Sequence, residues 1–569
     1  MRRKERSTRA DRVRPRLALG ALVVALGALA RARGLAQGAG DADAAVVPLL
    51  RERLDRMRTE GPAVRAQAQV SARAALPEIY EEGGYRPLWT PERLETLLAL
   101  VRESAEDGLR PEDYHLEELT RRTSSAGPGA DPAARAETDL LATDAFFLLI
   151  YHLYLGKVDP KSLDPHWNFE PRPVGSQEGD RFVFQALTQG RLREAVERVR
   201  PDHWWYANAR AALAEYRGLA ARGGWPSVPA GPALKPGAKG PRILALRRRL
   251  AATGDLAGRS EAPDDDVFDA PLAAAVQAFQ ERHRLEHDGN VGAETLAELN
   301  VPVEARVLQI RINLERARWV LHEIKPGDLV IVDVAGFNTV FVRDGKPIWR
   351  SRTQVGKPFR QTPIFKAKID HVVFNPTWTV PPGILAKDTL PAARKDPGYL
   401  ERKGLDLIDK NGQKIDPTSV DWTSKSFPYT VRQEAGPDNA LGRVKIMFPN
   451  SYHVYLHDTP SKALFEKEAR AFSSGCMRVD RPLELVELLL ADPQSWSASK
   501  IDAAVATGKT QTVRLRQPVP VLIMYWTIDP TVEKKTVFKR DPYGRDEALA
   551  QALDEAYVPA RAAAAAGTR

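Results

Sequence analysis

The sequence predicts a multidomain protein with three folded parts: an α-helical region, a small three-helix domain, and a mainly β domain that carries an inserted polar segment. Its length of 569 residues is enough for several domains. Apolar residues recur at helical spacing over residues 76–322 and at strand spacing from residue 328 onward. A stretch rich in proline and glycine, residues 225–241, separates two helical parts. These three observations together predict the fold class.

The N-terminal residues have the pattern of an export signal. Eight arginine and lysine residues between positions 2 and 16 precede an apolar run, Leu17–Ala30, and small residues follow it. This run is shorter than the roughly 20 residues that a membrane-spanning helix needs. We therefore expect a signal peptide over residues 1–36 and an N-terminal extension over residues 37–75. An uncleaved N-terminal anchor is the alternative.

The export signal also accounts for most of the positive charge. The formal net charge is +9, and residues 1–36, with ten basic and two acidic residues, carry +8 of it. The remaining chain is therefore close to neutral. Because a nucleic-acid-binding domain needs a basic surface, this distribution argues against a nucleic-acid partner. Contact with a membrane is expected only through an uncleaved signal.

Residues 76–224 are predicted to form the helical region. Apolar residues occur on nearly every side of a helix between residues 140 and 160, interrupted by Asp144 and His152. That pattern is typical of a buried core helix and is too polar for a membrane span. His152 is therefore interpreted as a structural histidine. Residues 225–241 are predicted to form a semi-rigid linker without a core of its own.

Residues 242–300 predict a compact domain of three short helices. Two sets of apolar residues each share a helical face: Ile243, Leu246 and Leu250, then Leu272, Val276 and Phe279. Matches at Phe279-Gln280, Asp288-Gly289, Val291-Gly292 and Thr295-Leu296 resemble the peptidoglycan-binding domain of secreted wall enzymes. That family usually has glycine at the position of Arg284, which implies a different turn after the second helix. A generic three-helix unit is the alternative.

The mainly β domain is expected over residues 328–530, after a connecting helical segment at 301–327. Strand patterns occur at residues 328–334, 339–342, 371–375, 443–448 and 453–457. A polar insertion at residues 383–441 is predicted to be too irregular for a sheet and to act as a lid. The C-terminal tail, residues 531–569, is expected to be disordered after Tyr557.

The chemistry of this domain depends on Cys476, the single cysteine of the chain. One cysteine permits no internal disulfide and no zinc site built on several cysteines, and the histidines show no paired ligand spacing. A cysteine nucleophile needs a base or a positive charge nearby. His457 ends a predicted strand, whose alternation places His453, Tyr455 and His457 on one face. The alternatives are a buried structural cysteine and structural histidines, of which His453 is the first candidate.

The residues around Cys476 also suit acyl transfer. Gly475 permits a sharp turn and a close approach of substrate. Backbone N–H groups of residues 475–477 are expected to form an oxyanion hole. Arg478 is expected either to lower the pKa of the thiol or to position an acidic group of the substrate.

The stretch YLHDTPSKALFEKEARAFSSGCMRV resembles the L,D-transpeptidase catalytic signature, with a histidine in an H-[GD]-T element before S-x-G-C-x-R. Residues 375–384 and 432–450 also match, and the helical region is similar to the family's scaffold domain. The resemblance is to the large periplasmic type of Gram-negative bacteria and implies periplasmic export. Asp458 stands where small members often have glycine, but the large type is similar here. Because His457 precedes Cys476, a papain-like protease is disfavoured.

The resemblance implies roles for individual residues. Cys476 would be the nucleophile, His457 the proton acceptor and donor, Asp458 the residue whose backbone orients His457, and Gly475 part of the turn and oxyanion hole. Substrate contacts would come from Ser474, Tyr455, Trp378 and Arg478.

The resemblance also implies a reaction without metal or organic cofactor. A thioester would form with a peptidoglycan tetrapeptide stem, D-alanine would leave, and a second stem would complete a 3→3 crosslink. Carbapenems are expected to acylate the thiol, and cell-wall synthases are candidate partners. The alternatives are hydrolysis or exchange at the same site, and a wall-binding scaffold with an inactive fold.

Overall fold

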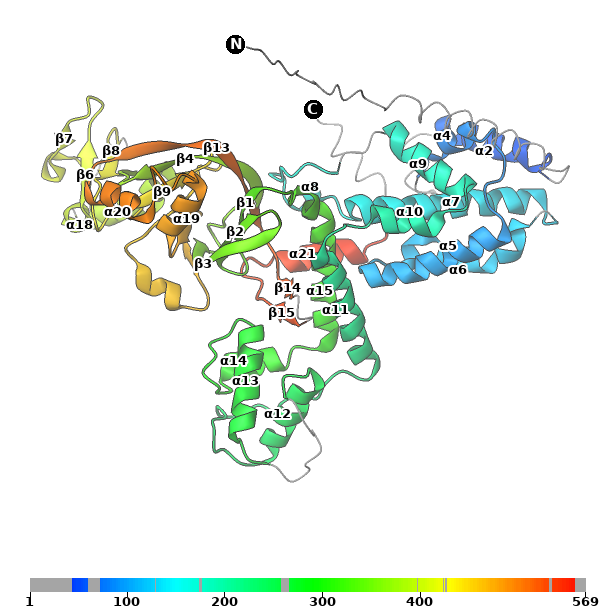
Figure 1. The fold of residues 1–569 in the computed structure, drawn as a ribbon, viewed down its shortest axis with the longest axis horizontal. Coiled ribbons are helices and arrows are strands. Elements are labelled where there is room, and N and C mark those ends of the chain that lie inside the picture. Colours follow the sequence, from blue (N-terminus) through cyan, green and yellow to red (C-terminus); the bar gives the residue numbers. More distant parts are fainter. Residues whose placement is uncertain are drawn as a thin grey trace, which may run out of the picture. The chain divides into compact units, whose positions relative to one another are not determined.

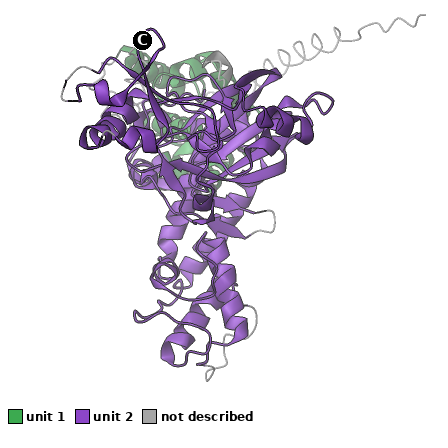
Figure 2. Cartoon of the chain, turned by 90° about the vertical axis from the view of Figure 1, so that its left-hand side faces the viewer, with its two compact units in different colours: residues 1–100, 114–148, 176–195 green, residues 101–113, 149–175, 196–569 purple. Residues whose placement is uncertain are grey.

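The computed structural model describes residues 43–59, 72–127, 129–172, 176–256, 266–396, 398–422, 424, 427–531 and 535–557. The predicted signal peptide and the tail after Tyr557 lie outside the described residues. The chain divides into two compact units, coloured separately in Figure 2. One comprises residues 1–100, 114–148 and 176–195, and the other comprises residues 101–113, 149–175 and 196–569.

The first unit is helical, as the sequence predicts. Its helices are α2 (Val46–Thr59), α4 (Leu76–Glu82), α5 (Pro91–Glu103), α6 (Leu116–Arg121), α7 (Pro132–Leu155), α9 (Ser176–Thr188) and α10 (Leu192–Val199), some of which continue into the second unit. The buried Asp139 of α7 accepts hydrogen bonds from the Tyr80 hydroxyl (2.6 Å) and from the backbone N–H groups of Leu88 and Trp89.

Helix α7 is a core helix. Among the described residues it is the one helix long and apolar enough to cross a membrane, and 78% of its most apolar stretch is buried. His152 is fully buried in it, and burial lowers the pKa of its imidazole well below the ordinary value. This placement agrees with its interpretation as a structural histidine.

The small helical domain lies within the second unit. Helices α12 (Pro241–Ala252), α13 (Ala270–Arg282) and α14 (Ala293–Leu299) lie together in Figure 1. Ile243, Leu246, Leu250, Leu272, Val276 and Phe279 are all buried in their common core, as their spacing predicts. The expected difference at Arg284 does not arise, because Arg284 itself adopts the left-handed conformation (φ 54°) that favours glycine.

The predicted linker needs a correction. Val228 and Leu234 are buried in the core of the small domain, and the backbone of Leu234 pairs with that of Val291. Much of the stretch at residues 225–241 therefore belongs to the domain. The composition of this stretch, rich in proline and glycine, predicts a linker. Two apolar residues within it, Val228 and Leu234, nevertheless pack into the core of the small domain.

Further helices precede and follow the β domain. They are α8 (Pro160–Leu163), α11 (Trp204–Ala221), α15 (Val303–Val320) and α21 (Arg545–Asp554), with a short hairpin of β14 (Ile528–Pro530) and β15 (Thr536–Phe538). Helix α11 packs along α15. The rings of Trp205 and Trp526 lie 4.5 Å apart and join α11 to the end of the β domain.

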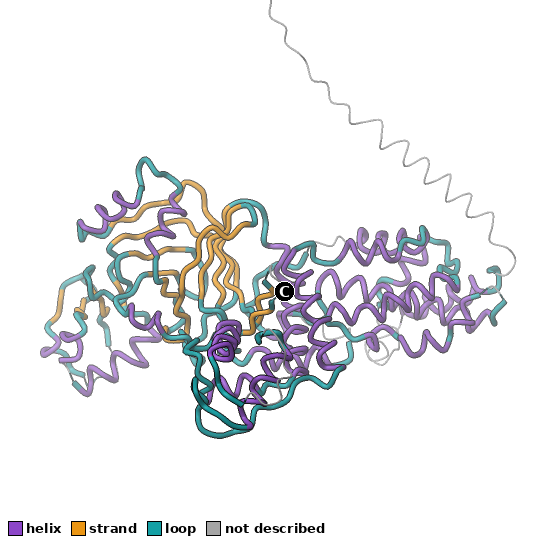
Figure 3. Tube along the Cα trace, turned by 60° about the horizontal axis from the view of Figure 1, so that its bottom comes forward, coloured by secondary structure: helices purple, strands orange, loops and turns teal. Residues whose placement is uncertain are grey.

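The β domain is built on one mixed sheet, whose strands gather in Figure 3. Its strands are β1 (Asp328–Asp333), β2 (Asn338–Arg343), β3 (Lys346–Gly356), β4 (Phe365–Phe374), β9 (Val444–Met447), β10 (Leu456–His457), β11 (Ala471–Ser473), β12 (Met477–Val479) and β13 (Gln511–Met524). Their order is β11-β3-β12-β10-β9-β4-β13-β1-β2, and a further pairing of β2 with β3 closes the sheet on itself. Helices α19 (Pro482–Leu490) and α20 (Ala498–Ala506) follow β12.

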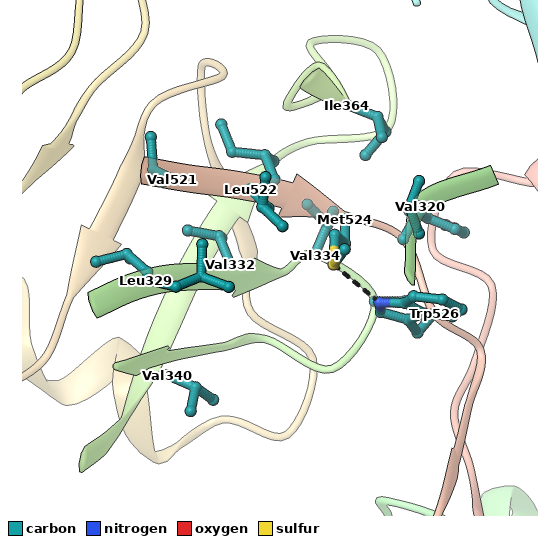
Figure 4. Close-up of a cluster of buried hydrophobic side chains, with 14 of the residues drawn as sticks. Val320, Leu329, Val332, Val334, Val340, Ile364, Val521, Leu522, Met524 and Trp526 are labelled. Atoms are coloured by element: carbon teal, nitrogen blue, oxygen red, sulfur yellow. Dashed lines mark hydrogen bonds between the residues drawn. The ribbon is translucent and has the colours of Figure 1, made fainter. Parts of the chain in front are cut away.

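The sheet encloses an aliphatic core. Leu329, Val332, Val521 and Leu522 from neighbouring strands lie together in Figure 4. At the end of β13, the indole N–H of Trp526 donates to the sulfur of Met524 at 3.3 Å. Burial of such side chains contributes about 1.5–3 kcal/mol each, which makes the sheet a rigid support for the residues at its strand ends.

The insertion has more structure than the sequence predicts. Residues 378–433 contain β5 (Trp378–Thr379), α16 (Pro382–Ile384), a π-helical turn (Leu385–Thr389), α17 (Leu390–Lys395), α18 (Gly398–Arg402), β6 (Leu405–Ile408), β7 (Lys414–Ile415) and β8 (Thr430–Gln433). The strands form a separate sheet in the order β5-β8-β6-β7. Val380, Ala393, Leu400, Leu407 and Val431 form a separate core. The expectation of an irregular segment without a sheet is wrong. Strands of two to four residues are too short to show a clear alternation of polar and apolar residues in the sequence.

Candidate active site

Strands β10 and β12 bring the candidate residues together. They are parallel neighbours, with Leu456 opposite Met477 and His457 opposite Arg478. Leu456 and Met477 are fully buried on the core side of the sheet. Because side chains alternate along a strand, His457 and Arg478 share the opposite face. Tyr455 and Cys476 directly precede the paired residues, and the Met477 N–H donates to the Tyr455 carbonyl at 3.1 Å.

The strand that carries His457 is shorter than predicted. It covers only Leu456–His457, and His453 adopts a left-handed conformation (φ 57°) that breaks the alternation. His453 is exposed and does not join the shared face through strand geometry. Tyr455 and His457 remain neighbours, with ring centroids 5.7 Å apart.

The turn before Cys476 requires glycine for its conformation. Gly475 has a φ of 120°, which L side chains rarely adopt, although the nearest atoms to an added Cβ would be 3.7 Å away. The Thr362 hydroxyl donates to the Gly475 carbonyl at 2.8 Å. The Ser473 hydroxyl donates to the Cys476 carbonyl and accepts from the Gly475 N–H. These hydrogen bonds hold the turn from both sides.

Fewer backbone N–H groups are free for the expected oxyanion hole than the three of residues 475–477. The Gly475 N–H is used by the Ser473 hydroxyl, and the Met477 N–H by the Tyr455 carbonyl. Of the N–H groups predicted for this role, that of Cys476 is left to meet a developing oxyanion. The Tyr455 side chain, which acts to lower the pKa of the thiol, is a second candidate donor.

Cys476 is held as a thiol near neutral pH. Burial raises the pKa of the Cys476 thiol, while hydrogen bonding to Tyr455 and the positive charges of Arg478 and Lys445 act to lower it. Burial outweighs these effects, so the net change is upward. Arg478 therefore acts in the predicted direction without producing a resting thiolate.

His457 is held as a neutral imidazole. Its Nδ1 hydrogen-bonds to the Asp458 carbonyl, an acceptor, so Nδ1 carries the proton and Nε2 a lone pair. Burial lowers the pKa of His457 to about 3; the charge of Arg478 adds to the effect, and the hydrogen bond to Asp458 opposes it. The side chain is only 4% exposed. A neutral imidazole and a neutral thiol thus lie on the same face of the sheet, on neighbouring strands.

The Asp458 carboxylate anchors the segment that orients His457. It accepts from the backbone N–H of Arg443 (2.9 Å), from Arg443 Nε (3.1 Å) and from Lys462 Nζ (2.6 Å). Burial would raise the pKa of Asp458, but these hydrogen bonds outweigh it and hold the pKa below its usual value. Gly442 is needed here, because an added Cβ would lie 2.6 Å from the Asp458 carboxyl carbon.

Sequence reasoning missed Lys445, Arg443, Lys462 and Gly442. Lys445 lies opposite His457 on β9, and its Nζ is 5.2 Å from the centre of the Tyr455 ring. Burial lowers the pKa of Lys445. The alternation of polar and apolar residues over 443–447 predicts a strand. It does not show that Lys445 lies opposite His457, because that depends on the register of β9 with β10.

The predicted substrate contacts divide between two places. Ser474 is exposed beside Cys476 and accepts a hydrogen bond from Arg360 at 3.0 Å. Arg478 donates to the Gln354 side chain at 3.2 Å. Trp378 lies on β5 and packs against the insertion's own core. Among the described residues, no hydrogen bond or ring contact joins Trp378 to Cys476 or His457.

Arg360 links the insertion to the cysteine turn. Its guanidinium pairs with Asp388 in the π-helical turn, with one N···O distance of 2.9 Å, and also donates to Ser474.

Within the described ranges, no group of three or more His, Cys, Asp or Glu side chains could hold a metal ion.

Comparison with known families agrees with this division of the chain. Residues 327–523 match the L,D-transpeptidase catalytic domain, residues 74–213 match a scaffold domain, and residues 239–299 match a family described as "Putative peptidoglycan binding domain". These matches confirm the predicted resemblance and fold class.

One curated protein is also similar to this chain. A "Putative L,D-transpeptidase" of Haemophilus influenzae is 37% identical over 227 residues, which cover 39% of this chain and 45% of that protein. The chain thus matches less than half the length of this curated relative.

Two solved structures are also similar. An L,D-transpeptidase from Xylanimonas cellulosilytica and one from Stackebrandtia nassauensis are each 16% identical, with TM-scores of 0.16 and 0.20. Each match covers 52% of this chain, and 99% and 96% of those structures respectively. At such TM-scores they carry no argument about individual residues.

Proposed function

We propose that this chain, whose residues 327–523 form an L,D-transpeptidase catalytic domain, is a cysteine-dependent acyltransferase that crosslinks peptidoglycan stem peptides. The observation that carries the proposal is the register of β10 and β12, which sets His457 and Arg478 on one face beside Tyr455 and Cys476. A nucleophile with a neighbouring base is the arrangement that covalent catalysis requires.

The first half-reaction forms a thioester. His457 Nε2 takes the thiol proton as Cys476 Sγ attacks the carbonyl carbon of the third residue of a tetrapeptide stem. The oxyanion that develops meets the Cys476 N–H and the Tyr455 hydroxyl. The C–N bond then breaks, His457 returns the proton to the leaving amine, and D-alanine departs.

The second half-reaction transfers the acyl group. The side-chain amine of a neighbouring stem attacks the thioester, and His457 accepts the proton that this amine loses. When the C–S bond breaks, the proton passes to the departing sulfur and restores the thiol. The product is a 3→3 crosslink, and the low pKa of His457 keeps the base neutral at the start of each half-reaction.

Water or a free D-amino acid would compete with the acceptor amine, which gives hydrolysis or exchange at the same site. We propose that the insertion acts as a lid against water, supported by the bridge from Asp388 through Arg360 to Ser474. A wall-binding scaffold with an inactive fold is the other candidate; the intact set of Cys476, His457 and Gly475 argues against it.

The site of action follows from the same proposal. The predicted signal peptide would export the chain to the periplasm, where peptidoglycan stems and cell-wall synthases occur. Mass analysis of muropeptides after incubation with purified protein tests the proposed reaction. It should show 3→3-linked dimers and released D-alanine with the natural chain and neither with Cys476→Ala. Equal crosslinking by Cys476→Ala would rule out this mechanism.

A further inference from the structure

A cavity of about 430 Å³ lies where the small helical domain meets the β domain. Its lining contains more positive than negative charge. Among the described residues, three carboxylates and six arginines line it: Arg284, Arg350, Arg352, Arg470, Arg481 and Arg540. The formal charge of this lining is therefore +3, in a chain that is nearly neutral beyond its signal.

Half of these arginines are already neutralised. Arg540 pairs with Glu294 at 2.8 Å, Arg352 with Asp480 at 2.9 Å, and Arg481 with Glu484 at 2.9 Å. Arg284, Arg350 and Arg470 have no ion-pair partner among the described residues. Three unpaired guanidinium groups therefore face one cavity.

Arg470 is the least hydrated of the three. Its Nη1 donates to the Lys467 carbonyl at 2.7 Å, while its Nε is buried without an acceptor in the described part of the chain. Burial lowers the pKa of Arg470; the negative charge of Glu468 opposes this effect, and the charges of Arg352 and Arg284 add to it. A largely desolvated cation is stabilised when an anion binds beside it.

The cavity is connected to Cys476 by one strand. The Arg470 carbonyl accepts from the Val355 N–H at 2.9 Å, and β11 follows it directly, parallel to β3. Residues 474–476 continue from β11 into the cysteine turn. Six residues span at most roughly 20 Å when extended, and the turn at Gly475 makes the separation shorter than that, so a short peptide can reach from the cavity to Cys476.

We propose that this arginine cavity binds the carboxylates of a peptidoglycan stem peptide, as a subsite separate from the position of the scissile bond. The inference rests on the proposed function. Three unpaired guanidinium groups match a ligand with several carboxylates, each able to accept paired hydrogen bonds from an arginine. The cavity would hold a strand with one stem while Cys476 acts on another.

The test measures binding to the full chain carrying Cys476→Ala, so that no turnover occurs. The probe is a synthetic stem tetrapeptide with free carboxylates, compared with the same peptide in which they are amidated. Arg470→Gln should weaken binding of the free-carboxylate peptide about tenfold, as expected for loss of charge-assisted hydrogen bonds. Amidation should weaken binding to the parent chain and have little further effect on the variant.

Matched variants separate a local effect from a change of fold. Arg284→Gln alters an exposed residue and should also weaken binding. Arg516→Gln removes an exposed arginine that pairs with Asp492 and should leave binding unchanged. Unchanged affinity in both Arg470→Gln and Arg284→Gln, or equal affinity for the amidated peptide, would overturn the inference.

Two further measurements distinguish this inference from a phosphate site and from a failure of the proposed function. Inorganic phosphate and unlabelled stem peptide are compared as competitors of the bound peptide. If phosphate displaces it at the lower concentration, the cavity is a phosphate site and the inference of a peptide site is wrong. Arg470→Gln in a chain with Cys476 intact should still be acylated by a carbapenem. Failure of acylation in the natural chain would refute the proposed function and leave the binding measurement valid.

Discussion

At the scale of residues, Cys476 is a neutral thiol and His457 a neutral imidazole in the resting protein. Burial raises the pKa of the thiol and lowers the pKa of the imidazole, so both changes oppose a thiolate–imidazolium ion pair. In the proposed mechanism, proton transfer then belongs to the step in which sulfur attacks the substrate. The Asp458 carbonyl selects the His457 tautomer that this proposed transfer requires.

The base can be identified by comparing two histidines. His457→Gln should lower the acylation rate by about 10²–10⁴-fold, which is the usual contribution of a positioned acid–base group. His453→Gln should have a small effect, because His453 is exposed and outside the strand. Rates of acylation measured by stopped-flow mixing decide the matter. A larger loss at His453 would reverse the assignment.

Gly442 supports the base indirectly. Gly442→Ala should destabilise the domain by about 1–2 kcal/mol from its left-handed backbone alone. It should also slow acylation, since the new Cβ would displace Asp458 and the carbonyl that holds His457. Gly412→Ala is the matched control, because Gly412 has a φ of 81° and no atom within 4 Å of an added Cβ. Equal acylation rates in the two variants would exclude this positioning role.

The raised thiol pKa predicts a pH dependence. A thiol reacts with iodoacetamide as the thiolate, so alkylation of Cys476 should rise with pH through a midpoint above the ordinary cysteine pKa of about 8.5. Arg478→Gln should move this midpoint higher, since the Arg478 charge lowers the thiol pKa. A midpoint below neutral pH would show that Cys476 rests as a thiolate, and that the effect of burial on its pKa does not exceed that of the nearby positive charges and hydrogen bonds.

At the scale of elements, the insertion is a small folded subdomain that Arg360 joins to the cysteine turn. Arg360→Ala should free the π-helical turn from Ser474 and admit water, raising the ratio of hydrolysed tripeptide to crosslinked dimer. Arg402→Ala removes an ion pair with Asp396 inside the insertion and serves as the control. A product ratio that does not differ between the two variants would remove the lid from the mechanism.

Helices could be predicted from the sequence more fully than strands. The core residues of α12 and α13 follow from local periodicity, because a helix defines its own faces. The role of Lys445 could not be predicted, since it depends on the pairing of β9 with β10. The sheet of the insertion was missed because strands such as β5 and β7 contain only two residues.

At the scale of the whole molecule, sequence motifs identified Cys476 and His457, but the fold determines how they meet. The eighteen residues between them return the chain so that β12 lies parallel to β10, and no local pattern predicts that register. The role of Trp378 as a substrate contact stays a prediction. Its side chain packs against the core of the insertion.

The central claim is that Cys476, activated by His457, forms a thioester with an acyl donor. Intact-protein mass spectrometry after incubation with a carbapenem tests it most directly, because a strained lactam carbonyl accepts the same attack. The account predicts a stable one-to-one adduct on the natural chain, slower formation with His457→Gln and none with Cys476→Ala. An unshifted mass of the natural chain after prolonged incubation would contradict it and favour a wall-binding scaffold with an inactive site.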